Sequence, residues 1–193
     1  MRCFIALELP EELKNRLARV SRALACRFPE ARWVRPDSHH ITLAFFGEIK
    51  GTELDCARTA VQAAAGLEDS NLSFSGTELL PERGPARVLA LSVGAGAWEC
   101  KQIYEKINRS LADAARHAKL CPLNPEWPDG RLFRVHVTLA RAAGRPFPRD
   151  ISGVWEEISS WMQAPCRVSR CILYRSDLLP DGVRYEALLA VEL

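Results

Sequence analysis

The most constraining feature of this 193-residue chain is a tetrapeptide that occurs twice. His40-Ile41-Thr42-Leu43 is matched later in the chain by His136-Val137-Thr138-Leu139. In an extended strand, side chains alternate between two faces, so each His and the Thr two residues on point one way and the aliphatic residues point the other. Two such strands that face each other would bring together two imidazoles and two hydroxyls. These groups suit acid-base attack on a phosphodiester.

Hydrophobic periodicity and turn residues predict an order of elements that repeats around the two motifs. The order is β-α-β-α-β-β followed by α-β-α-β-β. Hairpin-linked strands mixed with helices indicate an α+β fold with largely antiparallel sheets. The simplest account is a weak internal duplication. We expect strands near 2–9, 40–46, 72–80, 87–93, 133–142, 166–174 and 183–192, a short extended piece at 33–34, and helices near 11–28, 52–65, 98–118 and 154–162.

Composition and charge bound the possibilities further. With 48% hydrophobic residues and no linker-like segment, the chain is expected to form one bilobed domain over 1–193. The formal charge of +2 is too balanced to predict nucleic-acid binding from net charge alone. A local basic segment does exist, since 131–149 holds five arginines and no acidic residue and includes the second motif. That segment favours a phosphate ligand, although arginines on a strand are also ordinary solvated charges.

Cysteine usage and hydropathy suggest a compartment. The seven cysteines are scattered, odd in number and without C-x-x-C spacing, which argues against a disulfide framework and against a zinc site. No apolar run approaches the ~18 residues of a membrane span, and the apolar stretch from Cys3 to Leu9 contains Glu8. We therefore expect a cytoplasmic protein that has no membrane association.

Other readings of the histidines compete with catalysis. A lone His beside a Thr is usually structural, and His39 and His117, which lack a Thr two residues on, are expected to be structural or surface groups. A metal site lacks ligands, because no Asp, Glu or Cys lies within four residues of either motif on the face that the histidines share. The chain also lacks a P-loop, a G-x-G-x-x-G and a G-x-S-x-G motif. We expect neither a metal nor a cofactor.

Beyond the tetrapeptides, the sequence resembles the two-histidine phosphoesterase superfamily and, within it, the RNA 2′,3′-cyclic phosphodiesterase branch, also called 2′-5′ RNA ligase. The opening Arg2 to Pro10 is similar to the R-x-F-I-A-x-x-L-P start of that branch. Trp33-Val34 with the segment from His40 to Glu48 is similar to W-V…H-x-T-L-x-F-x-G-E, and the segment from His136 to Arg141 to H-x-T-L-A-R. Val135 departs from the pattern, which usually has Pro before the second His.

The resemblance implies two antiparallel sheets around a central cleft, helices on the outside, and one motif on each sheet. It also implies hydrolysis of an RNA or nucleotide 2′,3′-cyclic phosphate to a 2′-phosphate without a metal, with 2′-5′ ligation as the reverse reaction. His136 would accept a proton from water and His40 would donate one to the leaving oxygen. Thr42 and Thr138 would bind the non-bridging phosphate oxygens.

Two further residues complete the expected substrate-binding set. Arg141 would contact the phosphate, but strand parity puts it on the face opposite His136 unless a bulge intervenes. Phe46 is the phenylalanine that parity directs to the cleft, where it could stack on a base. The Pro-rich loop 121–128 is a candidate cleft margin.

Alternatives stay open for the function and the assembly. One is an enzyme of the same fold that acts on 2′-5′ oligonucleotides or a small cyclic nucleotide, and another is a nucleotide- or RNA-binding module without catalysis. The expected partner is RNA with a 2′,3′-cyclic phosphate end, and the expected assembly is a monomer.

Overall fold

The computed structural model describes residues 1–121, 123, 133–179 and 182–193. Its strands are β1 (Arg2–Glu8), β2 (Ala31–Trp33), β3 (His40–Glu48), β4 (Ser70–Leu72), β5 (Phe74–Leu80), β6 (Val88–Val93), β7 (His136–Ala142), β8 (Cys166–Val168), β9 (Arg170–Leu179) and β10 (Gly182–Glu192). The α-helices are α1 (Glu11–Leu24), α2 (Thr52–Gln62), α3 (Ala97–His117) and α4 (Val154–Met162), and η1 (Pro36–Ser38) is a 3₁₀ turn.

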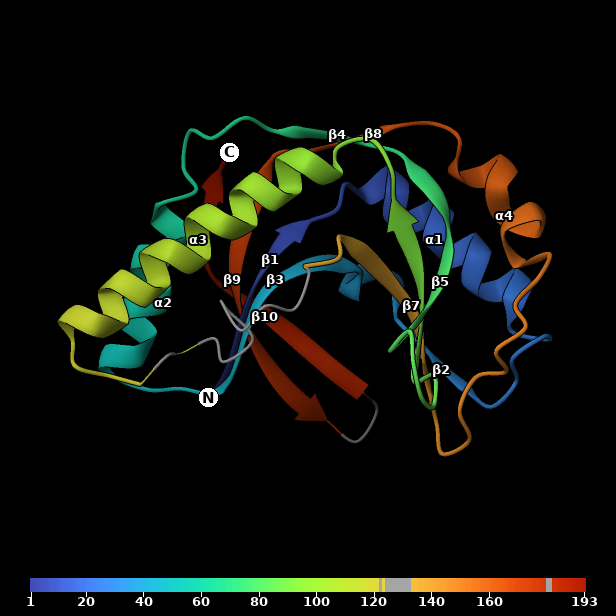
Figure 1. Ribbon diagram of the computed structural model, residues 1–193, viewed down its shortest axis with the longest axis horizontal. Helices are drawn as coiled ribbons and strands as arrows, with labels where there is room; N and C mark the ends of the chain where they lie inside the picture. Colours follow the sequence, from blue (N-terminus) through green and yellow to red (C-terminus); the bar gives the residue numbers. More distant parts are fainter. Residues whose placement is uncertain (122, 124–132, 180–181) are drawn as a thin grey trace.

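Two antiparallel sheets of four strands each form the framework. We call them sheet A, in the order β10-β9-β1-β3, and sheet B, in the order β2-β7-β6-β5. Helices α2 and α3 lie on the side of sheet A, and α1 and α4 lie on the side of sheet B (Figure 1). The short strands β4 and β8 pair with each other and form a small third sheet. The two motif strands, β3 and β7, lie close together where sheets A and B meet.

Apolar periodicity explains why these segments fold as they do. Helix α1 buries Leu13, Leu17, Val20 and Leu24, which recur at helical spacing along one face. Strand β1 lies inside sheet A and is buried from Cys3 to Leu7, as expected for a strand covered on both faces. Buried side chains of both sheets belong to the same hydrophobic cluster. The framework that carries the two motifs therefore has a shared core.

The predicted α+β class, the antiparallel sheets and the order of the main elements are confirmed. The strand expected at 72–80 is instead two strands, because the chain leaves β8 after Leu72 and joins β6 from Phe74. At the break, Ser73 exchanges backbone hydrogen bonds with the segment after β6, donating to the Ala95 carbonyl and accepting from the Gly94 amide. Strand β7 begins at His136 itself. Most of the loop 121–128 lies outside the described residues.

Each sheet takes strands from both halves of the sequence. Sheet A combines β1 and β3 with the C-terminal hairpin β9–β10, and sheet B combines β2, β5 and β6 with β7. The motif strands also differ in position, since β3 is at an edge of sheet A whereas β7 lies between β6 and β2. In the described part of the chain, no helix is both long and apolar enough to cross a membrane.

Candidate active site

His40 lies at the start of β3 and is held on both sides of its ring. Its Nδ1 is 2.8 Å from the Ser38 carbonyl oxygen, and its Nε2 is 3.1 Å from the Thr42 hydroxyl. A carbonyl oxygen can only accept, so Nδ1 carries the proton, and the Nε2 of the neutral ring accepts from Thr42. The turn η1, which ends at Ser38, thus fixes both the tautomer and the orientation of this imidazole.

His136 repeats this arrangement on the other sheet. Its Nδ1 is 2.9 Å from the carbonyl oxygen of Arg134, again two residues upstream, so Nδ1 is the donor here as well. The Arg134 side chain pairs with Glu78 and Glu82, which ties the segment before β7 to the region of β5. The Nε2 of each motif histidine is therefore the nitrogen left to exchange a proton with a ligand.

A β-bulge follows each motif and changes which later side chains share its face. In β3, Thr42 is paired with Ala6 and Ala44 with Ile5, so Leu43 is the extra residue. In β7, Thr138 is paired with Ala90 and Ala140 with Leu89, so Leu139 is the extra residue. Both members of each bulge are buried, namely Leu43, Ala44, Leu139 and Ala140. The next side chain in each strand therefore returns to the face of the His and the Thr.

In β7 that next side chain is Arg141. It is exposed, and its positive charge acts on two groups of the other sheet. Burial lowers the pKa of His40 and raises the pKa of Tyr185, and the charge of Arg141 adds to the first shift and opposes the second. Because of this bulge, Arg141 can share a face with His136 and Thr138. Their cross-strand neighbours on β6, Ser92 and Ala90, belong to the same face.

In β3 the next side chain is Phe45, not Phe46, and the parity argument for Phe46 does not hold. Phe45 is paired with Phe4, on the face that carries Thr42, and it is 47% exposed. The Arg2 guanidinium lies 5.8 Å from its ring centroid. Phe46 is partly buried against the hydrophobic core. Parity failed because the bulge adds one residue between Thr42 and the two phenylalanines.

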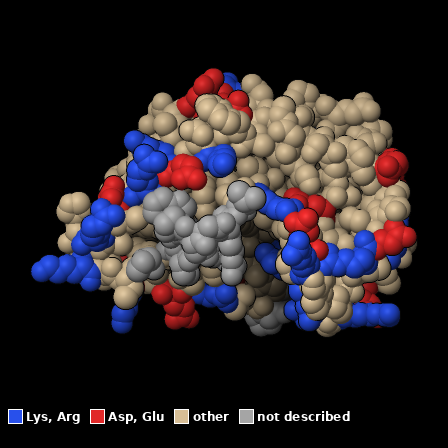
Figure 2. Space-filling model, viewed as in Figure 1, with Lys and Arg blue, Asp and Glu red and all other residues tan. Residues whose placement is uncertain are grey.

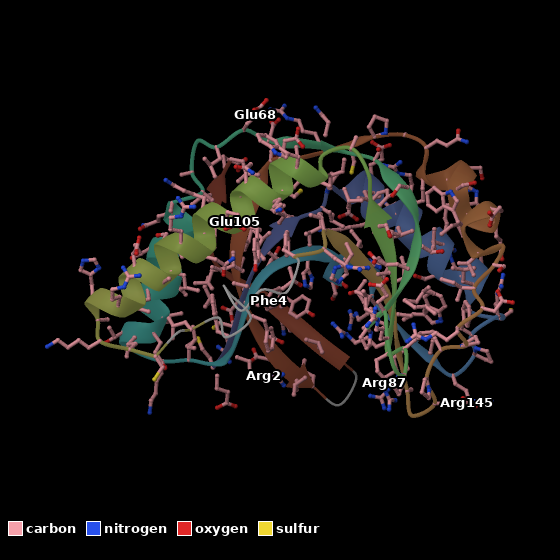
Figure 3. All side chains as sticks on the ribbon, in the orientation of Figure 1. Arg2, Phe4, Glu68, Arg87, Glu105 and Arg145 are labelled. Carbon is pink, nitrogen blue, oxygen red and sulfur yellow. The ribbon has the colours of Figure 1, made fainter. Side chains whose placement is uncertain are left out.

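An aromatic cluster packs against His40 and was not found from the sequence. Phe4 lies near the middle of the molecule (Figure 3), with its ring centroid 4.8 Å from that of His40. Tyr185 of β10 meets the His40 ring edge-on at 5.4 Å, and Tyr174 of β9 stacks on Phe4 at 5.2 Å. These residues come from β1, β9 and β10, so only the strand order of sheet A brings them together. No local sequence signal marks them.

Burial controls the protonation of His40. The enclosed ring has its pKa lowered from 6.5 to about 4, mainly because burial disfavours the imidazolium. The hydrogen bond to the Ser38 carbonyl opposes this effect, and the charges of His39, Arg141 and His136 add to it. At pH 7 the unliganded protein therefore holds His40 neutral.

The remaining histidines lie apart from this chemistry, in the places expected. His39 is 3% exposed, and its Nδ1 is 3.2 Å from the Pro36 carbonyl oxygen. Burial lowers the pKa of His39. His117 is exposed at the end of α3, with its Nδ1 2.7 Å from the Asp113 carbonyl oxygen. Among the described residues, no three His, Cys, Asp or Glu side chains are grouped as metal ligands would be.

A hollow lies in the lower centre of the face shown in Figure 2, and Lys and Arg side chains gather beside it. One cavity of about 420 Å³ is lined by Ser38 and Tyr185, which both contact the His40 ring, together with Arg35, Asp37 and Leu179. The same cavity borders η1 on one side and the β9–β10 hairpin on the other. The two motif strands together provide imidazoles, hydroxyls and the Arg141 guanidinium, groups that suit an anionic ligand that exchanges protons.

Known proteins are similar to this chain in sequence and in fold. A family model described as LigT like phosphoesterase matches residues 7–90. The RNA 2′,3′-cyclic phosphodiesterase of Methanothermobacter thermautotrophicus is 28% identical over 187 residues, covering 96% of this chain and 95% of that protein. The RNA 2′,3′-cyclic phosphodiesterase of Aeropyrum pernix is 27% identical over 179 residues, covering 92% of this chain and 95% of that protein.

Solved structures extend the likeness over the whole fold. The protein TT0787 of Thermus thermophilus matches with a TM-score of 0.73 and 26% identity, covering 100% of this chain and 98% of that one. LigT of E. coli in complex with ATP matches with a TM-score of 0.68 and 20% identity, covering 100% of this chain and 97% of that one. With its paired motifs on adjoining strands, the chain is similar to the LigT-like phosphoesterases in sequence over residues 7–90, and its whole fold is similar to that of TT0787.

Proposed function

We propose that this protein hydrolyses the 2′,3′-cyclic phosphate at the end of RNA, or of a nucleotide, to a 2′-phosphate. One observation carries the proposal: two imidazoles from different sheets are both held with Nδ1–H on a backbone carbonyl, each with a threonine two residues on. Binding alone would not need two matched, oriented proton carriers. The names of the relatives above point to the same substrate class.

The mechanism assigns one proton transfer to each histidine. The Nε2 of neutral His136 accepts a proton from water as the water oxygen bonds to phosphorus. The bond from phosphorus to the ribose 3′ oxygen breaks, and protonated His40 gives its Nε2 proton to that oxygen. Thr42 and Thr138 donate hydrogen bonds to the non-bridging oxygens, where negative charge builds up, and Arg141 adds a charge-assisted contact. The histidines return to their starting protonation states by exchange with solvent.

His40 can act as the proton donor only if substrate binding converts its neutral imidazole to imidazolium. Its pKa of about 4 leaves it neutral in the unliganded protein at pH 7. A phosphate anion beside the ring favours imidazolium and raises that pKa, whereas Arg141 opposes the change. Substrate binding and proton uptake are therefore coupled at this residue. On this basis, nucleoside 2′-phosphate should bind more tightly as the pH falls from 7 toward 5.

The exposed ring of Phe45 offers a stacking surface for a base next to the cyclic phosphate. It occupies the place in β3 that Arg141 occupies in β7, because each is the first side chain after a bulge. We assign base contact to Phe45 in place of Phe46. Joining uses the same groups in the same roles: an RNA hydroxyl replaces water, His136 accepts its proton as it bonds to phosphorus, and His40 protonates the leaving 3′ oxygen, which leaves a 2′-5′ phosphodiester. The two histidines exchange roles in the reverse of this step, when the 3′ hydroxyl attacks that phosphodiester. Dilute water favours hydrolysis by mass action.

The test is incubation with adenosine 2′,3′-cyclic phosphate, with and without EDTA, followed by separation of the 2′- and 3′-phosphates. We expect the 2′-phosphate alone, at equal rates in both conditions. A 3′-phosphate product would reverse the assigned direction, and loss of turnover with EDTA would require a metal. Absence of turnover on this nucleotide and on short cyclic-ended RNA would contradict the proposal.

A further inference from the structure

A second arginine lies directly opposite Arg141. Strands β2 and β7 are antiparallel, and their register pairs Arg32 with Arg141, between the pairs Trp33 with Ala140 and Ala31 with Ala142. Directly opposed residues of an antiparallel pair project from the same face, with Cα atoms about 5 Å apart. Arg32 is exposed, as Arg141 is. Both side chains therefore lie on the face that carries His136 and Thr138.

This pair of like charges lacks a neutralising group in the described part of the protein. Described carboxylates form ion pairs with many other arginines, including Arg35, Arg134, Arg170 and Arg175. Neither Arg32 nor Arg141 takes part in such a pair with a described carboxylate. Like charges placed directly opposite each other are destabilising. A bound anion would convert that repulsion into two favourable contacts.

The two arginines are not equivalent in their position relative to the cyclic phosphate. The cyclic phosphate must lie beside the imidazoles and Thr138, and Arg141 is the nearer of the two arginines to these groups along β7. Arg32 is displaced from β7 toward the edge of sheet B, because β2 is the outermost strand. The cyclic end is the 3′ end of an RNA, so every other phosphate lies on its 5′ side. The nearest of these is the phosphodiester that joins the last two nucleosides.

We propose that Arg32, paired with Arg141, binds the phosphodiester on the 5′ side of the terminal nucleotide, so that the site favours an RNA end over a mononucleotide. This inference rests on the proposed function and goes beyond it. A charge-assisted hydrogen bond contributes about 1.5–3 kcal/mol, and 1.4 kcal/mol corresponds to tenfold. Loss of Arg32 should therefore penalise a dinucleotide about tenfold more than a mononucleotide.

The experiment compares the dinucleotide ApA ending in a 2′,3′-cyclic phosphate with adenosine 2′,3′-cyclic phosphate, which has no 5′ phosphate. For Arg32→Gln, the ratio of kcat/KM for the dinucleotide to that for the mononucleotide should fall about tenfold. Arg32→Lys should restore part of it. Arg109→Gln on α3 removes the same charge from the groove between α2 and α3, and it should leave the ratio unchanged.

Calorimetry with the 2′-phosphates of ApA and of adenosine gives the corresponding ratio of binding affinities. The inference is therefore tested even if no cyclic phosphate is turned over. If the wild type showed no turnover but Arg32→Gln lowered the affinity ratio tenfold, only the proposed function would be contradicted. If Arg32→Gln lowered the affinity for the dinucleotide and for the mononucleotide equally, Arg32 would lie at the terminal phosphate, and the inference would be overturned. An unchanged ratio would overturn it as well. Circular dichroism of each variant checks that the fold is intact.

Discussion

Replacing His40 by Asn should remove much of the pH dependence of stability. In the folded protein the pKa of His40 is about 4, against 6.5 for an unperturbed imidazole. Between these values the unfolded chain binds a proton that the folded chain does not bind, so stability falls as the pH falls through this range. From pH 7 to pH 4.5, His40 alone should lower the free energy of unfolding by about 2 kcal/mol. Asn cannot take up this proton, and its amide can still donate to the Ser38 carbonyl.

Urea unfolding of the wild type and of His40→Asn, measured at pH 7 and pH 4.5, gives this quantity. The wild type should lose about 2 kcal/mol more than the variant over that interval. His117→Asn, at the exposed end of α3, is the matched control and should follow the wild type. His39 titrates in all three proteins, so its contribution cancels. Equal losses in the wild type and in His40→Asn would refute the link between burial and the low pKa.

Four other measurements probe the site and the residues that support it. His136→Asn should lower kcat by about 10²–10⁴-fold while Kd for nucleoside 2′-phosphate, from calorimetry, changes little; equal loss of binding would contradict the proton-transfer role. Asn108→Leu should destabilise the fold by about 1–3 kcal/mol in thermal unfolding, because the buried Asn108 amide donates to the Leu43 carbonyl of the β3 bulge at 3.3 Å; an unchanged Tm would show that the carbonyl needs no donor. Phe45→Ala should weaken binding of a cyclic nucleotide by about 1–3 kcal/mol, whereas Phe46→Leu should affect stability more than affinity. EDTA should leave kcat/KM unchanged, and a loss that Zn²⁺ or Mg²⁺ restores would call for a metal.

Local pattern was enough to predict the elements and the motif side chains. The spacing of Leu13, Leu17, Val20 and Leu24 predicted α1, and all four are buried on one face. Alternation along His40 to Leu43 predicted that the imidazole and the Thr42 hydroxyl share a face, and the two groups lie within hydrogen-bond distance. Period-two and period-3.6 patterns are local properties, so a single sequence records them.

Features that depend on pairing could not be predicted in the same way. A bulge is a mismatch between two strands, and nothing within the segment Leu43 to Phe46 reveals that the pairing with β1 will skip Leu43 and then Phe46. Phe46 was therefore directed to the wrong face, and Arg141 could be placed only conditionally. Phe4 and Tyr185 meet His40 through the order of strands in sheet A, which places the C-terminal strand β10 in one sheet with β1 and β3. The tautomer-fixing carbonyls of Ser38 and Arg134 required the three-dimensional structure.

The two bulges give a symmetric backbone an asymmetric chemistry. Each motif strand presents three side chains in a row, but the third is a phenyl ring on sheet A and a guanidinium on sheet B. A ligand with one flat, uncharged part and one anionic part can satisfy both lobes in one orientation only. If the substrate were turned round, its phosphate would lie against Phe45 and its base against Arg141. The residue after each bulge would thus decide which ribose oxygen faces which imidazole, and hence which phosphate ester survives the reaction.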